Sequence, residues 1–439
     1  MVPLGVRSAV AAVLLAALAA ASAAAAPPPV LVGQMQEHDL RYIVQKLSPH
    51  TVLFGSDQAA AFRRFAARTV AAAAKPLPPW RLLLLADRLT NYFHDPHTTV
   101  YAPTTGLTMI PVGFHWVQGG LAVYPVGPAS AGVEVGDSVV RLGGLTPRVL
   151  AQRLRRFFSG NPYWVRSFAG PQLSNGYLLH WLGVVGPHGS VNLLLRTPQG
   201  RLLQRTLYLA PVTYVSGLSA AIASVRFLDR FRAPLGLQEP LTSDWAWQVT
   251  PRAGIFWLTA CIDSAAYAQS VDAFFRQVAA AHAPIVILDL QANGGGYSSA
   301  VFPWLHHLPG TAALGQELGD TTARPQQPPI FRGRLYVLQS WSTFSAAVVV
   351  DDLLTGDGLA TSVGQPTGWS TGGWAAVKDY TTPLFGIPFQ VATENFPGTY
   401  GPLPASLQPE ISLPLTLRDV QLGVNPIDRW LASVAPGAR

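Results

Sequence analysis

The chain is organised around one serine, which lies within Gly333-Arg-Leu-Tyr-Val-Leu-Gln-Ser-Trp-Ser-Thr-Phe-Ser345-Ala-Ala-Val-Val-Val-Asp-Asp-Leu-Leu354. The apolar run Leu335 to Leu338 predicts a buried strand. The segment Ala346 to Leu354 predicts a helix, because it contains no Gly or Pro. Ser345 stands at the start of that helix, so its side chain either caps the helix or faces a reacting group. The N–H groups at a helix start favour a developing oxyanion, so a catalytic serine would be placed here.

The composition indicates a globular chain of more than one domain. Its 439 residues exceed one ordinary domain, and 49% of them are hydrophobic against 12% that are charged. The single cysteine, Cys261, excludes an internal disulfide and a cysteine-based metal cage. No zinc-binding histidine pattern is present either, so we predict neither a metal nor another cofactor.

Residues 1–26 read as a secretory signal. Arg7 supplies a positive start, Ala9 to Ala21 an apolar core, and Ser22 to Ala26 small residues for cleavage. No later stretch has 18 consecutive apolar residues, so we expect no integral membrane segment in the mature chain. We therefore expect a periplasmic or secreted protein. The net charge of +7 is not gathered into basic runs with aromatics, and export also argues against nucleic acid. The oligomeric state cannot be deduced from the sequence.

Three domains are predicted after the signal. Residues 27–106 have apolar residues at helical spacing and form a helical N-terminal arm, 107–212 are rich in strands, and 213–439 alternate strands and helices. This alternation predicts an α/β domain with a mixed or mostly parallel sheet. In such sheets the active groups lie at the carboxyl ends of the strands, where Ser345 is expected.

A glycine-rich turn follows the expected strand Ile285 to Leu290, in Asp289-Leu-Gln-Ala-Asn-Gly-Gly-Gly296. Its spacing fits neither the dinucleotide nor the P-loop fingerprint. It can instead supply N–H groups to an oxyanion, or it can simply be a turn that needs glycine.

The strand-rich part contains Gly136-Asp137, an apolar strand and Gly143-Gly144, followed by the expected helix Pro147 to Phe158. A hairpin is predicted around Pro198-Gln-Gly200. This order resembles half of a PDZ domain. The resemblance implies a module that grips an extended peptide by strand addition. A β-rich spacer that binds nothing is the alternative.

Four motifs in order resemble the tail-specific, or C-terminal-processing, serine proteases, a family that includes the tricorn protease core. They are Asp289-Leu-Gln-Ala-Asn293-Gly-Gly295-Gly, Thr343-Phe-Ser345-Ala346, Val363-Gly-Gln-Pro-Thr367-Gly368 and Pro409-Glu410. The resemblance implies a catalytic domain of the ClpP/crotonase-like type, with Ser345 as nucleophile. It also implies that the N–H groups of Gly295 and Ala346 stabilise the oxyanion.

The general base departs from the commonest family pattern. Many members place a lysine in a Gly-Lys-Gly turn, but Trp369-Ser-Thr-Gly372 has none, and only Lys378 follows Ser345. Asp95-Pro-His97-Thr98 resembles the Asp-Gly-His-Thr segment of tricorn-type members. We therefore prefer His97 as the base, since a neutral imidazole accepts a proton near neutral pH. The alternative is that Asp95 and His97 only stabilise a turn.

The acidic residue that would complete a catalytic triad with Ser345 and His97 is the least determined. Leu403 or its neighbours occupy the position that the tricorn type gives to an acid, and Glu394 is the candidate, with Glu410 as another nearby carboxylate. The resulting prediction is an exported serine endopeptidase that cleaves polypeptides through an acyl-enzyme. A catalytically inactive peptide- or lipophile-binding protein on the same fold is the alternative, because the family includes such relatives.

Overall fold

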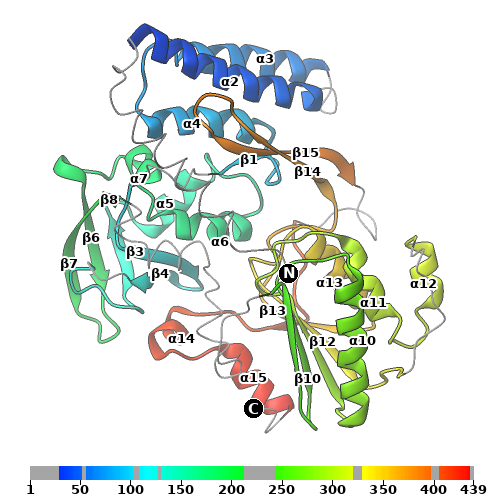
Figure 1. The fold of residues 1–439 in the computed structure, drawn as a ribbon. Coiled ribbons are helices and arrows are strands. Elements are labelled where there is room, and N and C mark those ends of the chain that lie inside the picture. The colour runs from blue at the N-terminus through cyan, green and yellow to red at the C-terminus, as the bar shows by residue number, and fades with distance from the viewer. Residues whose placement is uncertain are drawn as a thin grey trace, which may run out of the picture.

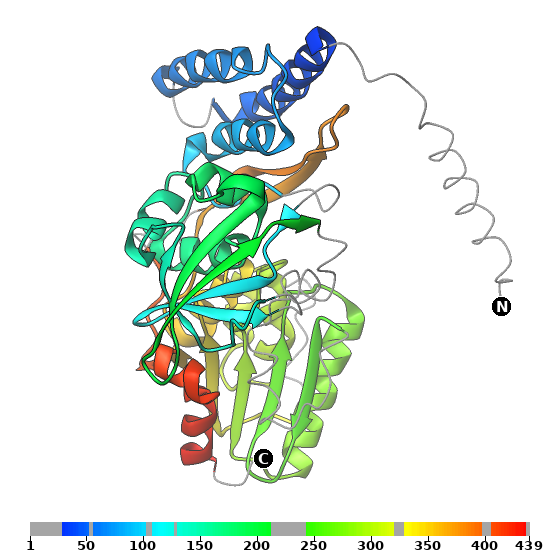
Figure 2. The same ribbon diagram turned by 90° about the vertical axis from the view of Figure 1, so that its left-hand side faces the viewer.

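The computed structural model describes residues 29–51, 56–101, 108–126, 130–211, 243–319, 329–396 and 405–435. The predicted signal lies outside these residues. Figures 1 and 2 show a layer of helices, an antiparallel β-unit and an α/β unit, with a long β-hairpin reaching from the α/β unit to the helices. None of the helices in the described ranges has the length and apolar character needed to cross a membrane.

The helical layer contains three helices, α2 (Pro29–Thr51), α3 (Ser56–Ala71) and α4 (Pro79–Thr90). Leu40, Ile43 and Leu47 repeat at helical spacing and are fully buried, so the predicted apolar face of α2 does form its contact surface. The short helix η2 (Asn91–Phe93) follows α4. It ends at His94, which has a positive φ of 54°, and the chain then turns into the segment that contains His97.

The β-unit is one antiparallel sheet in the order β3-β4-β5-β6-β7. Its strands are β3 (Val112–Val117), β4 (Gly120–Val126), β5 (Ser138–Leu142), β6 (Ser190–Arg196) and β7 (Leu202–Tyr208), and β2 (Thr108–Met109) pairs separately with β8 (Ala210–Pro211). The predicted hairpin is confirmed, since Arg196 pairs with Leu202.

Three helices belong to the β-unit: α5 (Pro147–Leu154), α6 (Pro162–Gln172) and α7 (Gly176–Leu182), with a short η3 (Pro187–Gly189) before β6. The expected helix at 147–158 is α5, and it ends at Leu154, before the predicted end. The sequence did not predict α6 and α7. Gly170 and Pro171 interrupt the apolar pattern of α6, and α7 is only seven residues long. Helix α6 packs on β3, where a Cβ on Gly170 would lie 3.1 Å from the carbonyl oxygen of Phe114.

The α/β unit has a six-stranded sheet in the order β16-β13-β12-β11-β10-β9, in which only β9 is antiparallel to its neighbour. Its strands are β9 (Trp245–Val249), β10 (Gly254–Leu258), β11 (Ile285–Asp289), β12 (Arg334–Gln339), β13 (Thr361–Gly364) and β16 (Ile411–Ser412). The predicted mixed α/β fold is therefore confirmed.

Helices cover both faces of this sheet (Figure 1). The helices of this part of the chain are α10 (Ala265–Ala280), η5 (Ser298–Val301), α11 (Phe302–Leu305), α12 (Ala312–Glu317), α13 (Ala346–Gly356), α14 (Leu417–Leu422) and α15 (Pro426–Val434). Of these, α14 packs on the β-unit instead, where Val420 meets Val117 and Ala122. Leu288 and Val337 face the cluster that includes Trp304. The residues next to them in each strand, Ile287 and Leu338, face the other side of the sheet and pack with Ile427 and Leu431 of α15. Alternate strand residues thus fill two cores, as expected for a sheet buried on both sides.

The hairpin of β14 (Gly373–Thr381) and β15 (Pro388–Phe396) joins β1 (Thr99–Val100) in a third sheet, ordered β1-β15-β14. At its tip the N–H groups of Leu384 and Phe385 donate to the buried carboxylate of Asp39 on α2, at 3.1 and 2.7 Å. This hairpin therefore connects the α/β unit with the helical layer and brings the segment around His97 to the edge of the α/β unit.

Candidate active site

Ser345 lies on a sharp turn between β12 and α13. Its backbone has φ 55° and ψ −131°, a conformation that non-glycine residues rarely adopt. Its side chain forms no capping hydrogen bond. Capping therefore does not explain the serine. A strained backbone that costs about 1–3 kcal/mol and presents a hydroxyl at a helix start is the arrangement expected of a nucleophile.

The glycine turn after β11 lies directly against this serine. A Cβ on Gly295, whose φ is 109°, would be 2.5 Å from the Cβ of Ser345 and 3.0 Å from its Oγ. A Cβ on Gly296 would be 2.1 Å from the carbonyl oxygen of Cys261. Both positions therefore need glycine for close approach as well as for their backbone angles.

Asn293 holds the glycine turn in shape. Its side chain is fully buried, donates to the carbonyl of Leu258 at 3.1 Å and accepts the N–H of Gly295 at 2.8 Å. Its carbonyl accepts the N–H of Phe344 at 3.0 Å, which joins the turn to the serine loop. Asn293 thus connects the two motifs that the sequence placed at the ends of adjacent strands.

This bond corrects the predicted role of Gly295. Its N–H is already used by Asn293, so it is not free to stabilise an oxyanion. Gly296 and Ala346 line the same pocket as Ser345, and within the described ranges their N–H groups form no backbone hydrogen bond. Ala346 therefore keeps its predicted place, and Gly296 replaces Gly295 as the second candidate donor.

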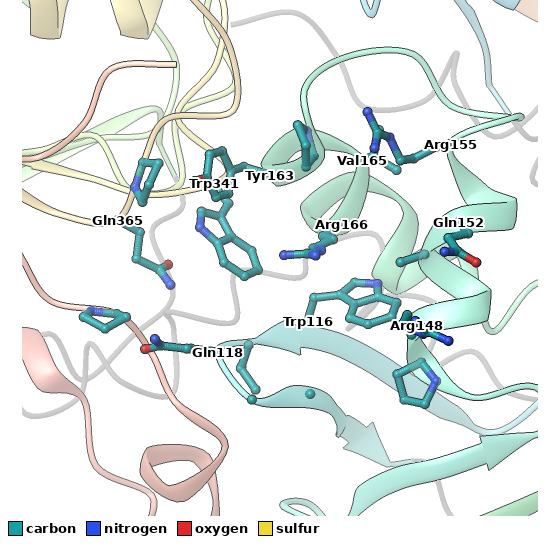
Figure 3. A pocket seen from close by; sticks show the side chains of 18 of the residues that line it. Trp116, Gln118, Arg148, Gln152, Arg155, Tyr163, Val165, Arg166, Trp341 and Gln365 are labelled. Atoms are coloured by element: carbon teal, nitrogen blue, oxygen red, sulfur yellow. The ribbon is translucent and has the colours of Figure 1, made fainter. Parts of the chain in front are cut away.

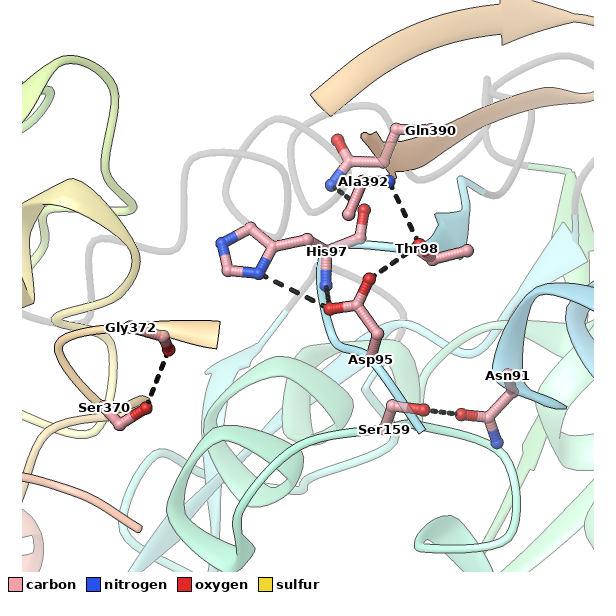
Figure 4. Close-up of polar contacts among 9 residues, drawn as sticks. All are labelled: Asn91, Asp95, His97, Thr98, Ser159, Ser370, Gly372, Gln390 and Ala392. Carbon is pink, nitrogen blue, oxygen red and sulfur yellow. Dashed lines mark hydrogen bonds and ion pairs between the residues drawn. The ribbon is translucent and has the colours of Figure 1, made fainter. Parts of the chain in front are cut away.

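His97 is buried and is supported by main-chain contacts from the hairpin (Figure 4). Its carbonyl accepts the side-chain N–H of Gln390 at 2.8 Å, and the Oγ of the adjacent Thr98 accepts the N–H of Ala392 at 3.1 Å. Asp95 accepts the backbone N–H of His97 at 2.9 Å and the hydroxyl of Thr98 at 2.7 Å. The loop is thus fixed at its backbone, while the imidazole projects toward the α/β unit.

The two ring nitrogens of His97 are buried without a hydrogen-bond partner among the described residues. Nδ1 lies 3.6 Å from Oδ1 of Asp95, slightly beyond hydrogen-bond length. The ring packs on Phe344, the residue before the serine, with ring centroids 4.5 Å apart. On its other side Phe344 stacks on Trp164 of α6 at 3.8 Å. An aromatic stack therefore sets the position of the imidazole beside the serine loop.

His97 and Ser345 line one pocket of about 420 Å³. Trp369, Trp374 and Phe396 give the pocket an aromatic wall, and none of the described residues that line it is Asp, Glu, Lys or Arg. The predicted residues are thus brought together from two sheets, since Ser345 and Ala346 follow β12 of the α/β unit and His97 precedes β1 of the hairpin sheet.

Two other candidates are not brought together with them. Lys378 lies on the exposed part of β14 and does not line the pocket. Glu394 is exposed on β15, and among the described residues it forms no ion pair or hydrogen bond with His97. The carboxylate beside the imidazole is that of Asp95, 3.6 Å from Nδ1, so no contact supports Glu394 as the third member. Leu403 lies outside the described residues. Glu410 accepts the N–H of Ser362 at 3.1 Å, so it supports β13.

Sequence reasoning missed the aromatic residues that shape the site. Phe344 lies inside the serine motif and Trp369 opens the lysine-free turn, so their positions in the motifs were the available signal. Trp164 had a weaker signal, the concentration of Trp and Phe within residues 157–182, which core packing explains equally well.

Cys261, the single cysteine of the chain, lies close to the glycine turn. Cys261 is buried beside Asn293, and burial raises the pKa of its thiol to about 12, so it is not a nucleophile. Within the described ranges no group of three or more His, Cys, Asp or Glu side chains could hold a metal ion.

Comparison with known proteins agrees with this site. Residues 256–380 match the model of peptidase family S41. A structure of mature CPAF complexed with lactacystin is 14% identical, with a TM-score of 0.62 over 92% of this chain and 98% of that chain. Another structure of mature CPAF is also 14% identical, with a TM-score of 0.60 over 92% of this chain and 97% of that chain. At such identity the likeness concerns the fold. No curated protein matches the sequence.

The fold and the family match define a serine peptidase. Residues 256–380 match family S41, to which the tail-specific and tricorn-type proteases that the sequence resembles also belong. The prediction of a serine peptidase is thereby confirmed, and the alternative of a catalytically inactive relative on the same fold is addressed by the labelling experiment below.

Proposed function

We propose that this serine peptidase is an exported endopeptidase in which Ser345 is the nucleophile and His97 the general base. One observation carries the assignment. Ser345 stands uncapped on a strained turn, and the buried imidazole of His97 lines the same 420 Å³ pocket with both ring nitrogens unpartnered. A buried imidazole without partners is costly unless it acts on a group that arrives during the reaction.

In the proposed reaction Nε2 of His97 accepts the proton of the Ser345 hydroxyl as Oγ attacks the peptide carbonyl. Nδ1 faces Asp95, whose carboxylate favours the imidazolium that forms. The imidazolium then gives its proton to the leaving amine, which leaves an acyl-enzyme. A water molecule, deprotonated by the same imidazole, hydrolyses the ester and restores the serine hydroxyl.

The oxyanion would be stabilised by the backbone N–H groups of Gly296 and Ala346. Both residues line the pocket, and Ala346 is the first residue of α13, where the helix dipole favours negative charge. Preorganised donors of this kind supply about 10²–10³-fold in rate each.

The pocket favours an apolar residue at the scissile bond. Val349, Trp369 and Phe396 line it, and it lacks a charged Asp, Glu, Lys or Arg side chain. Strand β14 forms the edge of its sheet and contributes Gly373 to the same lining. An extended substrate would therefore lie along this strand and direct an apolar side chain among the aromatic rings.

Export is proposed from the apolar segment 9–21 and the small residues after it. A periplasmic or secreted location follows from this signal. Expression of the whole chain, with sequencing of the N-terminus of the accumulated protein, tests it. Cleavage near Ala26 supports export, and retention of residue 1 on a protein kept inside the cell contradicts it.

Labelling with a fluorophosphonate probe tests the chemistry. We expect rapid labelling of the intact protein, none in Ser345→Ala, and a fall of about 10²-fold or more in His97→Ala. Ser370→Ala is a matched control, since that serine lines the same pocket but donates to the carbonyl of Gly372 at 2.9 Å. Persistent labelling in His97→Ala together with its loss in Lys378→Ala would assign the base to the lysine instead. An intact protein that resists the probe and cleaves no polypeptide would overturn the proposal.

A further inference from the structure

A second cavity, of about 620 Å³, lies between the β-unit and the α/β unit (Figure 3). The end of β3 and helices α5 and α6 form one side of it, and the segments near Trp341 and Gln365 form the other. We call it the arginine pocket, because three of its lining residues are Arg148, Arg155 and Arg166.

In the part of the chain that the structure describes, no carboxylate balances these three guanidinium groups. The lining contains no Asp or Glu, and among the described residues none of the three arginines forms an ion pair. Arg148, Gln152 and Arg155 follow each other at helical spacing along α5 and its end, so their side chains project from one face. Like charges repel in such an arrangement, and a bound anion relieves that repulsion.

Arg166 approaches from α6 and is the most enclosed of the three. Its guanidinium lies over the ring of Trp341 at 6.0 Å, and Figure 3 shows it extending from α6 toward that ring. Stacking on an aromatic ring orients a guanidinium and leaves its N–H groups free for a carboxylate.

The backbone edge of β3 is partly occupied at both ends, so little of it is open to the strand addition that the PDZ resemblance implied. Gln118 exchanges backbone hydrogen bonds with Leu415 and Leu417, at 2.9 and 3.1 Å. Helix α6 covers the other end, beside Phe114. Recognition at this place therefore depends on side chains rather than on an added strand.

The arginine pocket shares a wall with the active site. Helix α6 presents Tyr163 and Arg166 to the arginine pocket, and it presents Trp164 to Phe344 beside the serine. Ser167 of the same helix hydrogen-bonds Ser342 at 2.6 Å, so α6 holds the serine loop directly. A polypeptide that reaches Ser345 can thus be held at a second point next to the same loop.

We propose that the arginine pocket binds an acidic segment of the polypeptide substrate, with carboxylates paired to Arg148, Arg155 and Arg166. This inference rests on the proposed function, because it names the substrate class of that peptidase. The volume exceeds the needs of a single small anion, and Trp116 and Tyr163 add apolar surface for the body of a peptide.

The test is a binding measurement on Ser345→Ala protein, in which cleavage cannot occur. Two fluorescein-labelled peptides are compared by anisotropy, one with a run of Glu between leucines and one with Gln in place of every Glu. We expect the Glu peptide to bind at least about tenfold more tightly, with an affinity that falls as salt rises. Replacing Arg155 or Arg166 by Gln should weaken it about tenfold each.

Arg156→Gln is the matched control. It removes the same charge from the next position of the chain, and Arg156 does not line the pocket. Equal affinity for the two peptides, or an equal loss in Arg156→Gln, would overturn the inference. Binding of inorganic phosphate to the protein, without binding of the Glu peptide, would mark a small-anion site and would overturn the inference as well. The measurement needs no catalysis, so failure of fluorophosphonate labelling with intact peptide binding would reject the proposed function and leave the pocket assigned.

Discussion

The two halves of the active site are held in different ways. The serine half is fixed by contacts within the α/β unit, where Asn293 ties the glycine turn to the loop of Ser345 through hydrogen bonds of 2.8 and 3.0 Å. The histidine half comes from a loop far earlier in the chain and is fixed at its backbone by the hairpin, through Gln390 and Ala392. Among the described residues its imidazole nitrogens have no hydrogen-bond partner. The proposed nucleophile is thus held in place before substrate binds, whereas the proposed base would complete its hydrogen bonds only when substrate arrives.

From this difference we expect a substitution in the glycine turn to lower the fluorophosphonate labelling rate the most. In Gly295→Ala the new Cβ would lie 2.5 Å from that of Ser345, at a backbone φ of 109°, so the serine must move. We expect the fluorophosphonate labelling rate to fall about 10²–10³-fold, as when an oxyanion donor is lost. Gly294→Ala is the control, because a Cβ there meets nothing within 4 Å. Equal rates in the two variants would show that the serine is not held by this contact.

A smaller loss is expected on the histidine side. Asp95→Asn removes the charge 3.6 Å from Nδ1 while keeping an oxygen for the N–H of His97. The imidazolium loses its stabilising carboxylate, so labelling should slow by about 10²-fold, with the loss visible across the pH–rate profile. Asp272→Asn is a matched control, since Asp272 pairs with His307 at 2.9 Å outside the pocket. An unchanged rate in Asp95→Asn would leave Asp95 as a turn residue.

Removing a hydrogen bond between the hairpin and the His97 loop should lower the labelling rate by less than either substitution above. Gln390→Ala removes one hydrogen bond of 2.8 Å to the carbonyl of His97. Such a bond stabilises the position of His97 by about 1 kcal/mol, so we expect the labelling rate to fall about fivefold. Glu394→Gln on the same strand should label at the rate of the unmodified protein. A greater loss in Glu394→Gln than in Gln390→Ala would restore Glu394 as the acidic partner.

The smallest expected effect is on stability and comes from Asp351 on α13, the helix that follows Ser345. Asp351 on α13 is fully buried, neither of its carboxylate oxygens has a partner in the described part of the chain, and burial raises its pKa well above the usual value. A carboxyl with a raised folded-state pKa holds its proton longer in the folded protein than in the unfolded chain. Its contribution therefore makes the free energy of unfolding fall as pH rises above about 4.

Asp351→Asn removes this pH dependence. The variant should match the unmodified protein near pH 4 and exceed its melting temperature by a few degrees at pH 8, at about 2–4 °C per kcal/mol. Thermal unfolding followed by circular dichroism measures this, with the exposed Asp357→Asn as control. A lower melting temperature for Asp351→Asn at pH 8 would mean that the carboxylate has a favourable role in the folded state.

The sequence predicted the serine half well because its signals are local. The apolar runs at 285–290 and 335–338, the glycine turn and the proline-free helix after Ser345 each depend on neighbouring residues, and the structure has β11, β12 and α13 at these places. Parallel pairing then brings the strand ends together without further information.

The rest depended on contacts between distant residues, which local patterns do not encode. Strand β15 decides where His97 lies, but the pairing of Thr99 with Gln390 cannot be deduced from either segment alone. Gly295 was assigned to the oxyanion because the motif places it beside the serine. Only the buried Asn293 amide reveals that its N–H is occupied. Glu394 was favoured by its position in the chain, and its exposure could not be foreseen.

The single cysteine has a practical consequence. Cys261 is buried beneath the glycine turn, and with a thiol pKa of about 12 it remains protonated at neutral pH. The protein therefore offers almost no thiolate of its own to maleimide or iodoacetamide reagents. A cysteine introduced at the exposed Arg156 would accept one dye or spin label next to the arginine pocket. Occupation of that pocket could then be followed by spectroscopy on the otherwise unaltered chain.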